Sequence, residues 1–349
     1  MFSFRTTPLE DQLDKALLDG SVGVFASPAC WDSRRGYVWD IFSRRSNLAV
    51  LMLPAAEGGE SHIDFDIDKI RSLDALVVEI QDTGSRHFSY TGDVLRLMSA
   101  LATLPGAPPL YIVDRPNPLG RAVEGTLPAG ESDVFLPRVA HRHALTLGEL
   151  CLLYYDETEA SYPLHVISAN CSSSGKELMS WAVPPAPDIP GLFSAIMYTG
   201  GSLWADSSIN PGLGTGRPYE FIGAPFVKAS ASVPPAPEGV LMRPCSFVPR
   251  EGLYKDECCY GYQILLTPGA EYKSLMHTIT LMRYFSERYS QFTINDGLYT
   301  RLADPVMSEY LKGSIGLDIV EEHIKSEEQK WVRKARRFLL YDESPYRIR

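Results

Sequence analysis

The chain has 349 residues, of which 45% are hydrophobic and 22% charged, as expected for a globular protein with a sizeable core. This length predicts two domains. The formal net charge of −10 argues against an extended basic surface, so we expect no nucleic-acid partner. The first 20 residues contain acids and no apolar run of signal-peptide length, and no stretch reaches the roughly 18 apolar residues that a membrane span needs.

The cysteines predict a reducing compartment. All six are scattered along the chain, and only Cys258 and Cys259 are close in sequence, where neighbours rarely form a bridge with each other. We therefore expect free thiols and a cytoplasmic protein. An exported protein whose signal had been trimmed would have the same sequence, so export stays open.

Strand-like and helix-like segments alternate through the first half of the chain. The strands are nearly continuous apolar runs, which is typical of a parallel sheet covered on both faces. One helix start is well marked, because Thr146 and Glu149 form a capping-box pair ahead of an apolar run. The pattern predicts a doubly wound α/β domain, with helices at 8–20, 37–45, 67–74, 93–106 and 144–157 and strands at 21–28, 47–54, 75–82, 109–118 and 163–170.

The second half follows a different pattern. Prolines and glycines are dense from 181 to 227, so we expect little regular structure there. Strands are predicted at 242–250 and 259–268, followed by helices at 271–290 and 315–341. This order is typical of an α+β domain, and we place the boundary so that the domains are 1–223 and 224–349.

Polar residues follow three of the predicted strands. Because ligands of open parallel sheets bind beyond the carboxyl ends of the strands, three such strand ends favour a site. A single loop of this kind has an ordinary alternative, since Asp and Asn before proline are common turn residues. The residues concerned are Glu57 after the second strand, Asp82, Arg86, His87 and Tyr90 after the third, and Asp114, Arg115, Asn117 and Glu124 after the fourth.

Other motifs give weaker signals. GLGTGR at 212–217 lacks the spacing of a dinucleotide loop, and no G-x-S-x-G is present for a hydrolase nucleophile. HRH at 141–143 has no partner ligands at metal-site spacing. We therefore predict no metal and no cofactor. The remaining chemistry is acidic: the carboxylates of Glu57, Asp82 and Glu124, with Arg115, Arg142 and Arg217 as candidate anion ligands.

Five blocks of the sequence resemble, in order, the signature blocks of the NamZ-type exo-β-N-acetylmuramidases. The resemblance implies a Rossmann-like α/β domain, a smaller α+β domain and an active-site cleft between them. It also implies glycoside hydrolysis that releases N-acetylmuramic acid from non-reducing ends, with a peptidoglycan-derived saccharide as partner. The blocks are VVEIQDTGSRHFSY, YIVDRPNPLGRAVEG, HRHALTLGEL, VPPAPDIP and GLGTGRPYEFIGAPF.

The resemblance also suggests roles for the candidate residues. Glu124 matches a glutamate of the family and is predicted to be the general acid/base, with Glu57 or Asp82 as the supporting carboxylate. Arginines suit the lactyl carboxylate of muramic acid, while the remaining residues are candidate contacts to the sugar. For the arginines a structural ion pair is the alternative, and for Tyr90 and His143 a core or capping role. The predicted substrate-binding residues are Arg115, Asn117, Tyr90, Arg142, His143 and Arg217.

Two departures from the family pattern keep other functions open. Relatives have Pro-Glu-His-Gly where this chain has PAAEGG, so Glu57 is displaced, and Ala205 stands at a glutamate position. A sugar-binding protein that has lost catalysis is therefore an alternative. A nucleotide-linked enzyme is a weaker one, because the glycine fingerprint is missing.

Overall fold

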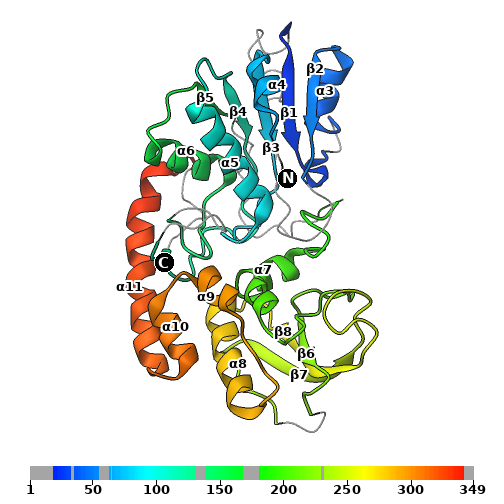
Figure 1. Cartoon of the computed structure of the whole chain (residues 1–349), viewed down its shortest axis with the longest axis vertical. Helices are drawn as coiled ribbons and strands as arrows, with labels where there is room; N and C mark the ends of the chain where they lie inside the picture. The colour runs from blue at the N-terminus through cyan, green and yellow to red at the C-terminus, as the bar shows by residue number, and fades with distance from the viewer. Residues whose placement is uncertain are drawn as a thin grey trace.

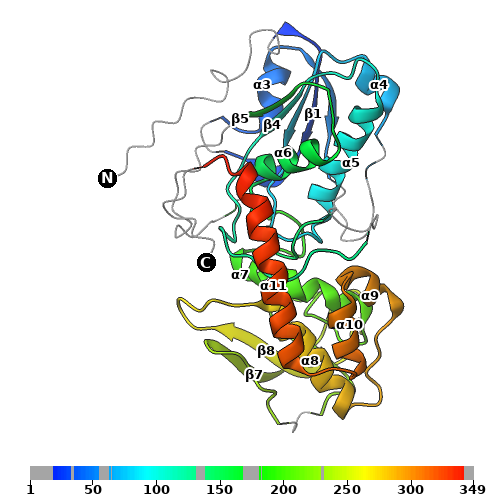
Figure 2. The same cartoon turned by 90° about the vertical axis from the view of Figure 1, so that its left-hand side faces the viewer.

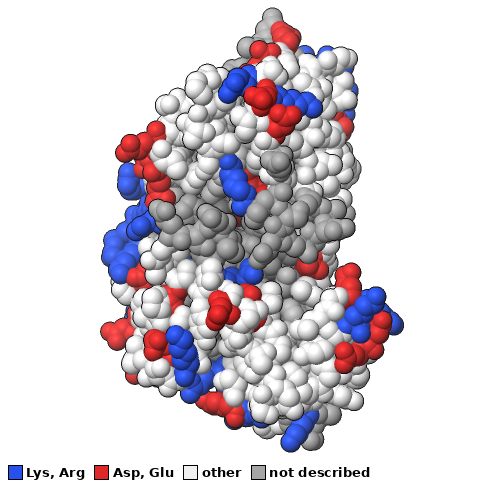
Figure 3. Space-filling view, in the orientation of Figure 1, with Lys and Arg blue, Asp and Glu red and all other residues white. Residues whose placement is uncertain are grey.

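The computed structural model describes residues 19–32, 35–54, 63, 65–130, 138–167, 181, 183–228 and 232–341. Glu57 and residues 8–18 of the first predicted helix lie outside the described residues. No helix among the described residues is long and apolar enough to cross a membrane. On the face drawn in Figure 3, acidic and basic side chains are intermixed over both halves of the molecule.

A parallel sheet forms the N-terminal half of the molecule (Figure 1). Its five strands, within the described chain, lie in the order β2-β1-β3-β4-β5. The three central strands are buried along their whole length, which agrees with their continuous apolar sequence. The strands are β1 (Val22–Ala26), β2 (Leu48–Met52), β3 (Ala75–Glu79), β4 (Leu110–Val113) and β5 (Leu164–Ile167).

Helices cover both faces of this sheet, as predicted. On one face, α3 (Val38–Arg44) packs with the side chains of β1 and β3 in one apolar cluster. On the other, α4 (Ile67–Arg71), α5 (Ser89–Thr103) and α6 (Leu147–Glu157) belong to a second, larger cluster. The capping box of α6 is confirmed, because Glu149 N donates to Thr146 Oγ1 at 3.3 Å and Thr146 N donates to Glu149 Oε2 at 2.9 Å.

The C-terminal half contains a smaller antiparallel sheet with helices packed against it. Its strands lie in the order β6-β8-β7, and the predicted boundary at residue 223 falls within β6 and stays a prediction. The strands are β6 (Phe221–Ala224), β7 (Val240–Phe247) and β8 (Cys259–Leu266). The helices are α7 (Leu192–Gly201), α8 (Ser274–Arg288), α9 (Asp296–Leu302), α10 (Pro305–Lys312) and α11 (Leu317–Ala335).

The expectation of sparse structure between 181 and 227 is wrong for two stretches, because α7 and β6 both lie in this range. Residues 191–210 contain no proline, and they form α7 followed by a 3₁₀ turn at Ser202–Asp206. A glycine is needed near the end of α7, because a Cβ on Gly200 would lie 2.2 Å from Ser274 O at the start of α8. Gly200 thus allows close packing of α7 on α8 rather than marking a loop.

The helix α11 connects the two halves (Figure 2). It starts in the C-terminal half and runs to α6 of the N-terminal half, where Trp331 Nε1 donates to His143 O at 2.9 Å. Beyond the helix, Tyr341 donates its hydroxyl proton to Asp114 Oδ2 at 2.6 Å. The C-terminal residues therefore support the segment between the fourth strand and α6.

Candidate active site

The sheet order identifies where a ligand of this fold would bind. The chain passes from β1 to β2 on one side and then crosses back to β3 on the other side of β1, so the topological switch point lies between β1 and β3. Glu79 is the last residue of β3, and its side chain is only 1% exposed. Arg35 follows β1 and Arg115 follows β4, so residues far apart in sequence meet here.

We call Glu79, Arg35, Arg115 and Gln81 the edge cluster. Glu79 Oε1 accepts a hydrogen bond from Arg115 Nη1 at 3.0 Å and one from Arg35 Nη2. Arg115 Nε donates to Gln81 Oε1 at 3.0 Å. The side chains of Arg35 and Arg115 are 17% and 21% exposed, so the cluster reaches solvent through its arginines. Arg115 was predicted, whereas the other three residues were missed.

A buried thiol, that of Cys30, lies within electrostatic range of this cluster. Burial raises the pKa of Cys30 to about 12, although the nearby Arg115 guanidinium works in the opposite direction. The thiol therefore stays protonated near neutral pH, where a nucleophilic role would need the thiolate.

Asp82 is buried, and both of its carboxylate oxygens accept hydrogen bonds from the protein. Its Oδ2 accepts from Gly84 N at 2.8 Å and its Oδ1 from Thr91 Oγ1 at 2.7 Å. His143 Nε2 lies 3.3 Å from Asp82 Oδ2. Burial alone would raise the pKa of Asp82, but His143 and the hydrogen bonds outweigh it and lower the pKa. The structure therefore brings two predicted residues together as an ionised carboxylate and its histidine partner.

Glu124 lies between the two halves of the molecule and is fully buried. Its Oε1 accepts from Leu275 N at 2.7 Å, in the first turn of α8, and its Oε2 lies 3.1 Å from Arg142 Nη2. Arg142 in turn donates from Nη1 to Tyr272 O at 3.1 Å. Burial raises the pKa of Glu124, while Arg142 and the helix N–H group lower it less strongly. The predicted Glu124 and Arg142 are thus paired with each other. Both also bond to the backbone at the start of α8, and these bonds join the two halves.

The remaining predicted substrate ligands have different surroundings. Asn117 is buried and donates from Nδ2 to Leu145 O at 2.9 Å, which holds its loop. Tyr90 is on α5, with its ring centroid 4.9 Å from that of Phe88, and burial raises its pKa. Arg217 is exposed on the surface and pairs with Glu220 at 2.9 Å.

The histidines of HRH bond to other protein groups. His141 Nδ1 accepts from Thr126 N at 3.2 Å, and its Nε2 lies 2.8 Å from Arg86 Nη2. His143 Nδ1 accepts from Leu145 N at 3.2 Å. Within the described ranges, no group of three or more His, Cys, Asp or Glu side chains could hold a metal ion.

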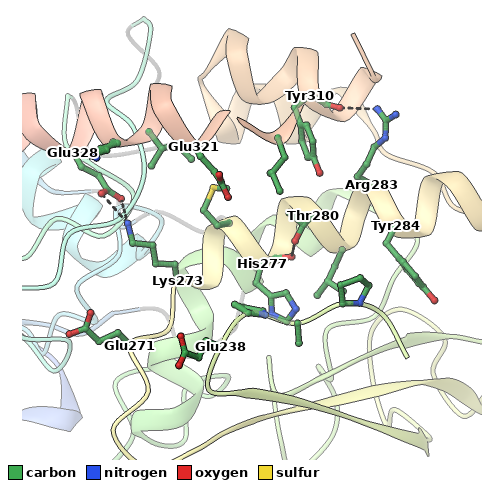
Figure 4. Close-up of a pocket in the computed structure, with 18 of the residues that line it drawn as sticks. Glu238, Glu271, Lys273, His277, Thr280, Arg283, Tyr284, Tyr310, Glu321 and Glu328 are labelled. Carbon is green, nitrogen blue, oxygen red and sulfur yellow. Dashed lines mark hydrogen bonds and ion pairs between the residues drawn. The ribbon is translucent and has the colours of Figure 1, made fainter. Parts of the chain in front are cut away.

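A large groove is found away from the sheet edge, in the C-terminal half (Figure 4). It has a volume of about 1310 Å³ and runs between α8, α11 and the proline-rich residues 234–238. The ion pair of Lys273 and Glu328, 2.9 Å apart, lies at one end, and Arg283 donates to Tyr310 O at 3.0 Å further along. None of the residues predicted for the site lines this groove.

Comparison with known proteins gives a consistent result. Models of the N-terminal and C-terminal domains of exo-β-N-acetylmuramidase NamZ match residues 22–192 and 196–341. The chain is 25% identical over 292 residues to the peptidoglycan β-N-acetylmuramidase NamZ of Bacillus subtilis strain 168, covering 78% of this chain and 69% of that protein.

Two crystal structures share the fold. Both are DUF1343 family proteins from Bacteroides fragilis NCTC 9343. The first has a TM-score of 0.80 and 21% identity and covers 96% of this chain and 97% of the other. The second has a TM-score of 0.76 and 19% identity, with 93% and 95% covered. At these identities the likeness is to the fold.

Proposed function

Because the chain belongs to the exo-β-N-acetylmuramidase NamZ family, we propose that it is a glycosidase that releases N-acetylmuramic acid from the non-reducing ends of peptidoglycan fragments. The observation that carries the proposal is the match of both family domains, which together span nearly the whole chain. The polar residues at the carboxyl edge of the sheet support it, because this is where a doubly wound fold binds its ligand.

The proposed chemistry needs a proton donor and a second carboxylate. Cleavage of a glycosidic bond passes through an oxocarbenium-like transition state, in which an acid protonates the leaving oxygen. Glu124 is our candidate acid, and its raised pKa favours the protonated form that a donor requires. Its two oxygens face Leu275 N and Arg142, so this role requires that the contact with α8 opens when substrate binds.

The supporting carboxylate is proposed to be Glu57 or Asp82. Asp82 is held ionised, since its pKa is lowered. However, its oxygens already accept hydrogen bonds from Gly84 and Thr91, and that arrangement suits a group that positions the loop. Glu57 lies in PAAEGG, the stretch of this chain that takes the place of the family's Pro-Glu-His-Gly run.

The test of the function is turnover of a chromogenic β-N-acetylmuramide. We expect the wild-type protein to release the chromophore and Glu124→Gln to lose about 10²–10⁴-fold in kcat, because an amide cannot donate a proton to the leaving oxygen. The urea midpoint of the same variant reports folding separately. Full turnover by Glu124→Gln would remove Glu124 from the acid role, and an inactive wild-type protein would contradict the proposal.

One observation favours a second function, that of a sugar-binding protein without catalysis. Ala205 replaces a glutamate of the family pattern and is exposed on the 3₁₀ turn after α7. The second function predicts binding of muropeptides, measured by calorimetry, with no sugar released after prolonged incubation.

A further inference from the structure

Over the described ranges, Glu79 has one carboxylate oxygen that no hydrogen bond uses, whereas Asp82 accepts hydrogen bonds on both of its oxygens. Glu79 Oε1 accepts from both arginines of the edge cluster, but Oε2 is buried and has no hydrogen-bond partner among the described residues. An unpaired buried acceptor costs stability, so its retention in a folded protein needs an explanation. A ligand that supplies a donor would provide one.

The neighbouring Arg35 has the complementary feature. Its Nη2 contacts Glu79 Oε1, whereas its Nη1 is buried and has no acceptor within the described part of the chain. The edge cluster therefore offers one unused acceptor and one unused donor on two side chains that are in direct contact. Both lie at the topological switch point of the sheet.

This pair fits one end of the proposed substrate. In a muramic acid residue at a non-reducing end, C4 carries a free hydroxyl, which is a hydrogen-bond donor. The adjacent C3 carries the lactyl ether, whose carboxylate is an acceptor and an anion. Adjacent donor and acceptor groups on the sugar match adjacent acceptor and donor groups on the protein.

We infer that Glu79 and Arg35 are the specificity-determining residues of the site, with Glu79 Oε2 accepting from the C4 hydroxyl and Arg35 Nη1 donating to the lactyl carboxylate. This inference rests on the proposed function. A sugar linked at C4 has no hydroxyl there, so it would leave Glu79 Oε2 unpaired and would be rejected. The pair thus accounts for both a muramic acid preference and action at chain ends.

Binding selectivity tests the pair independently of catalysis. Calorimetric titration with N-acetylmuramic acid and N-acetylglucosamine measures the contribution of the lactyl group. We expect the wild-type protein to prefer N-acetylmuramic acid by about tenfold or more, as a charge-assisted bond provides. Arg35→Lys keeps a cation beside Glu79 but removes the second guanidinium nitrogen, so it should lose this preference while still binding N-acetylglucosamine.

The role of Glu79 is measured with 4-deoxy-N-acetylglucosamine. The wild-type protein should bind this sugar about tenfold or more weakly than N-acetylglucosamine, and Glu79→Gln should bind the two nearly equally. A structural defect would weaken both sugars alike and leave the ratio unchanged. Arg243→Lys is the matched control, because Arg243 bonds to Gln263 in the other sheet, and it should behave as wild type.

The outcomes separate this inference from the proposed function. Unchanged ratios in Arg35→Lys and Glu79→Gln would overturn the inference even if the enzyme is active, and so would a wild-type protein that binds neither sugar. Ratios that shift as expected in a protein without hydrolytic activity would support the inference and reject the glycosidase.

Discussion

At the scale of single residues, buried carboxylates of this protein differ in how their oxygens are used. Asp114 Oδ1 accepts from Arg115 N and Gly148 N, and its Oδ2 accepts from Thr146 Oγ1 and Tyr341 Oη. Burial raises the pKa of Asp114 to about 6, and the bonds from Thr146 and Tyr341 limit the rise. With every oxygen occupied, Asp114 holds structure together, whereas Glu79 keeps an oxygen for a ligand.

His277 predicts a pH effect on stability. Burial lowers its pKa to about 4 from the ordinary 6.5, so the folded protein prefers the neutral ring. The unfolded chain binds the proton more tightly, and stability is lost as pH falls from 6.5 toward 4. Between pH 7.5 and pH 5, the unfolding free energy of the wild-type protein should fall by about 2 kcal/mol more than that of His277→Gln.

Urea unfolding at the two pH values measures this difference. Gln can still bond to the Tyr272 hydroxyl, which contacts His277 Nδ1 at 2.9 Å, so the variant should fold. Equal pH-dependent losses in the two proteins would show that His277 does not titrate as its burial implies.

At the scale of elements, the capping box of α6 predicts a local stability effect. Thr146 Oγ1 accepts from Glu149 N and donates to Asp114 Oδ2 at 2.6 Å. Thr146→Ala removes both bonds and should lower the unfolding free energy by about 1–2 kcal/mol. Thr158→Ala, at the exposed C-terminal end of the same helix, is the control and should cost less than about 0.5 kcal/mol. If urea unfolding gave equal losses of unfolding free energy for Thr146→Ala and Thr158→Ala, the stabilising role of the Thr146 cap would be contradicted.

The elements show how far the sequence predicts this fold. The apolar strands and the Thr146–Glu149 pair have local signals, and the structure confirms them. The helix α10 was missed although Asp304 before Pro305 is a start signal, and Asp304 Oδ1 does accept from Met307 N. The helix α7 begins after Gly191 without a side-chain cap. Its close contact with α8 at Gly200 is a tertiary interaction, which the local sequence does not reveal. No local pattern marks such a helix.

The candidate site was only partly predictable for a related reason. The residues after the third and fourth strands could be identified because polar groups follow apolar strands. Glu79 lies inside the strand pattern, and its partner Arg35 is 44 residues away in sequence. Their contact depends on the strand order, which places β1 beside β3. Similarly, the contact of Glu124 with α8 joins residues 151 positions apart.

At the scale of the whole molecule, buried polar contacts hold the two halves together. Arg86 donates to Thr126 O at 2.8 Å and to Leu302 O at 2.6 Å, so it contacts both halves. Glu124 contributes the bond to Leu275 N. These contacts, together with α11, hold the two halves in the arrangement that the structure shows.

This arrangement predicts a large cost for removing Glu124. Glu124→Ala takes away the acceptor at the start of α8 and leaves Arg142 buried without its carboxylate. We expect a loss of about 3–5 kcal/mol in the unfolding free energy. Glu220→Ala, which breaks the surface pair with Arg217, should cost less than about 1 kcal/mol. A loss of similar size in both variants would show that Glu124 does not join the halves.

The function of the whole molecule is tested by two disaccharides of opposite sequence. One has N-acetylmuramic acid β-1,4-linked to N-acetylglucosamine, with the muramic acid at the non-reducing end, and the other has the reverse order. After incubation with the wild-type protein, mass spectrometry should detect free N-acetylmuramic acid from the first disaccharide and no cleavage of the second. Cleavage of the second disaccharide, or of neither, would contradict the account.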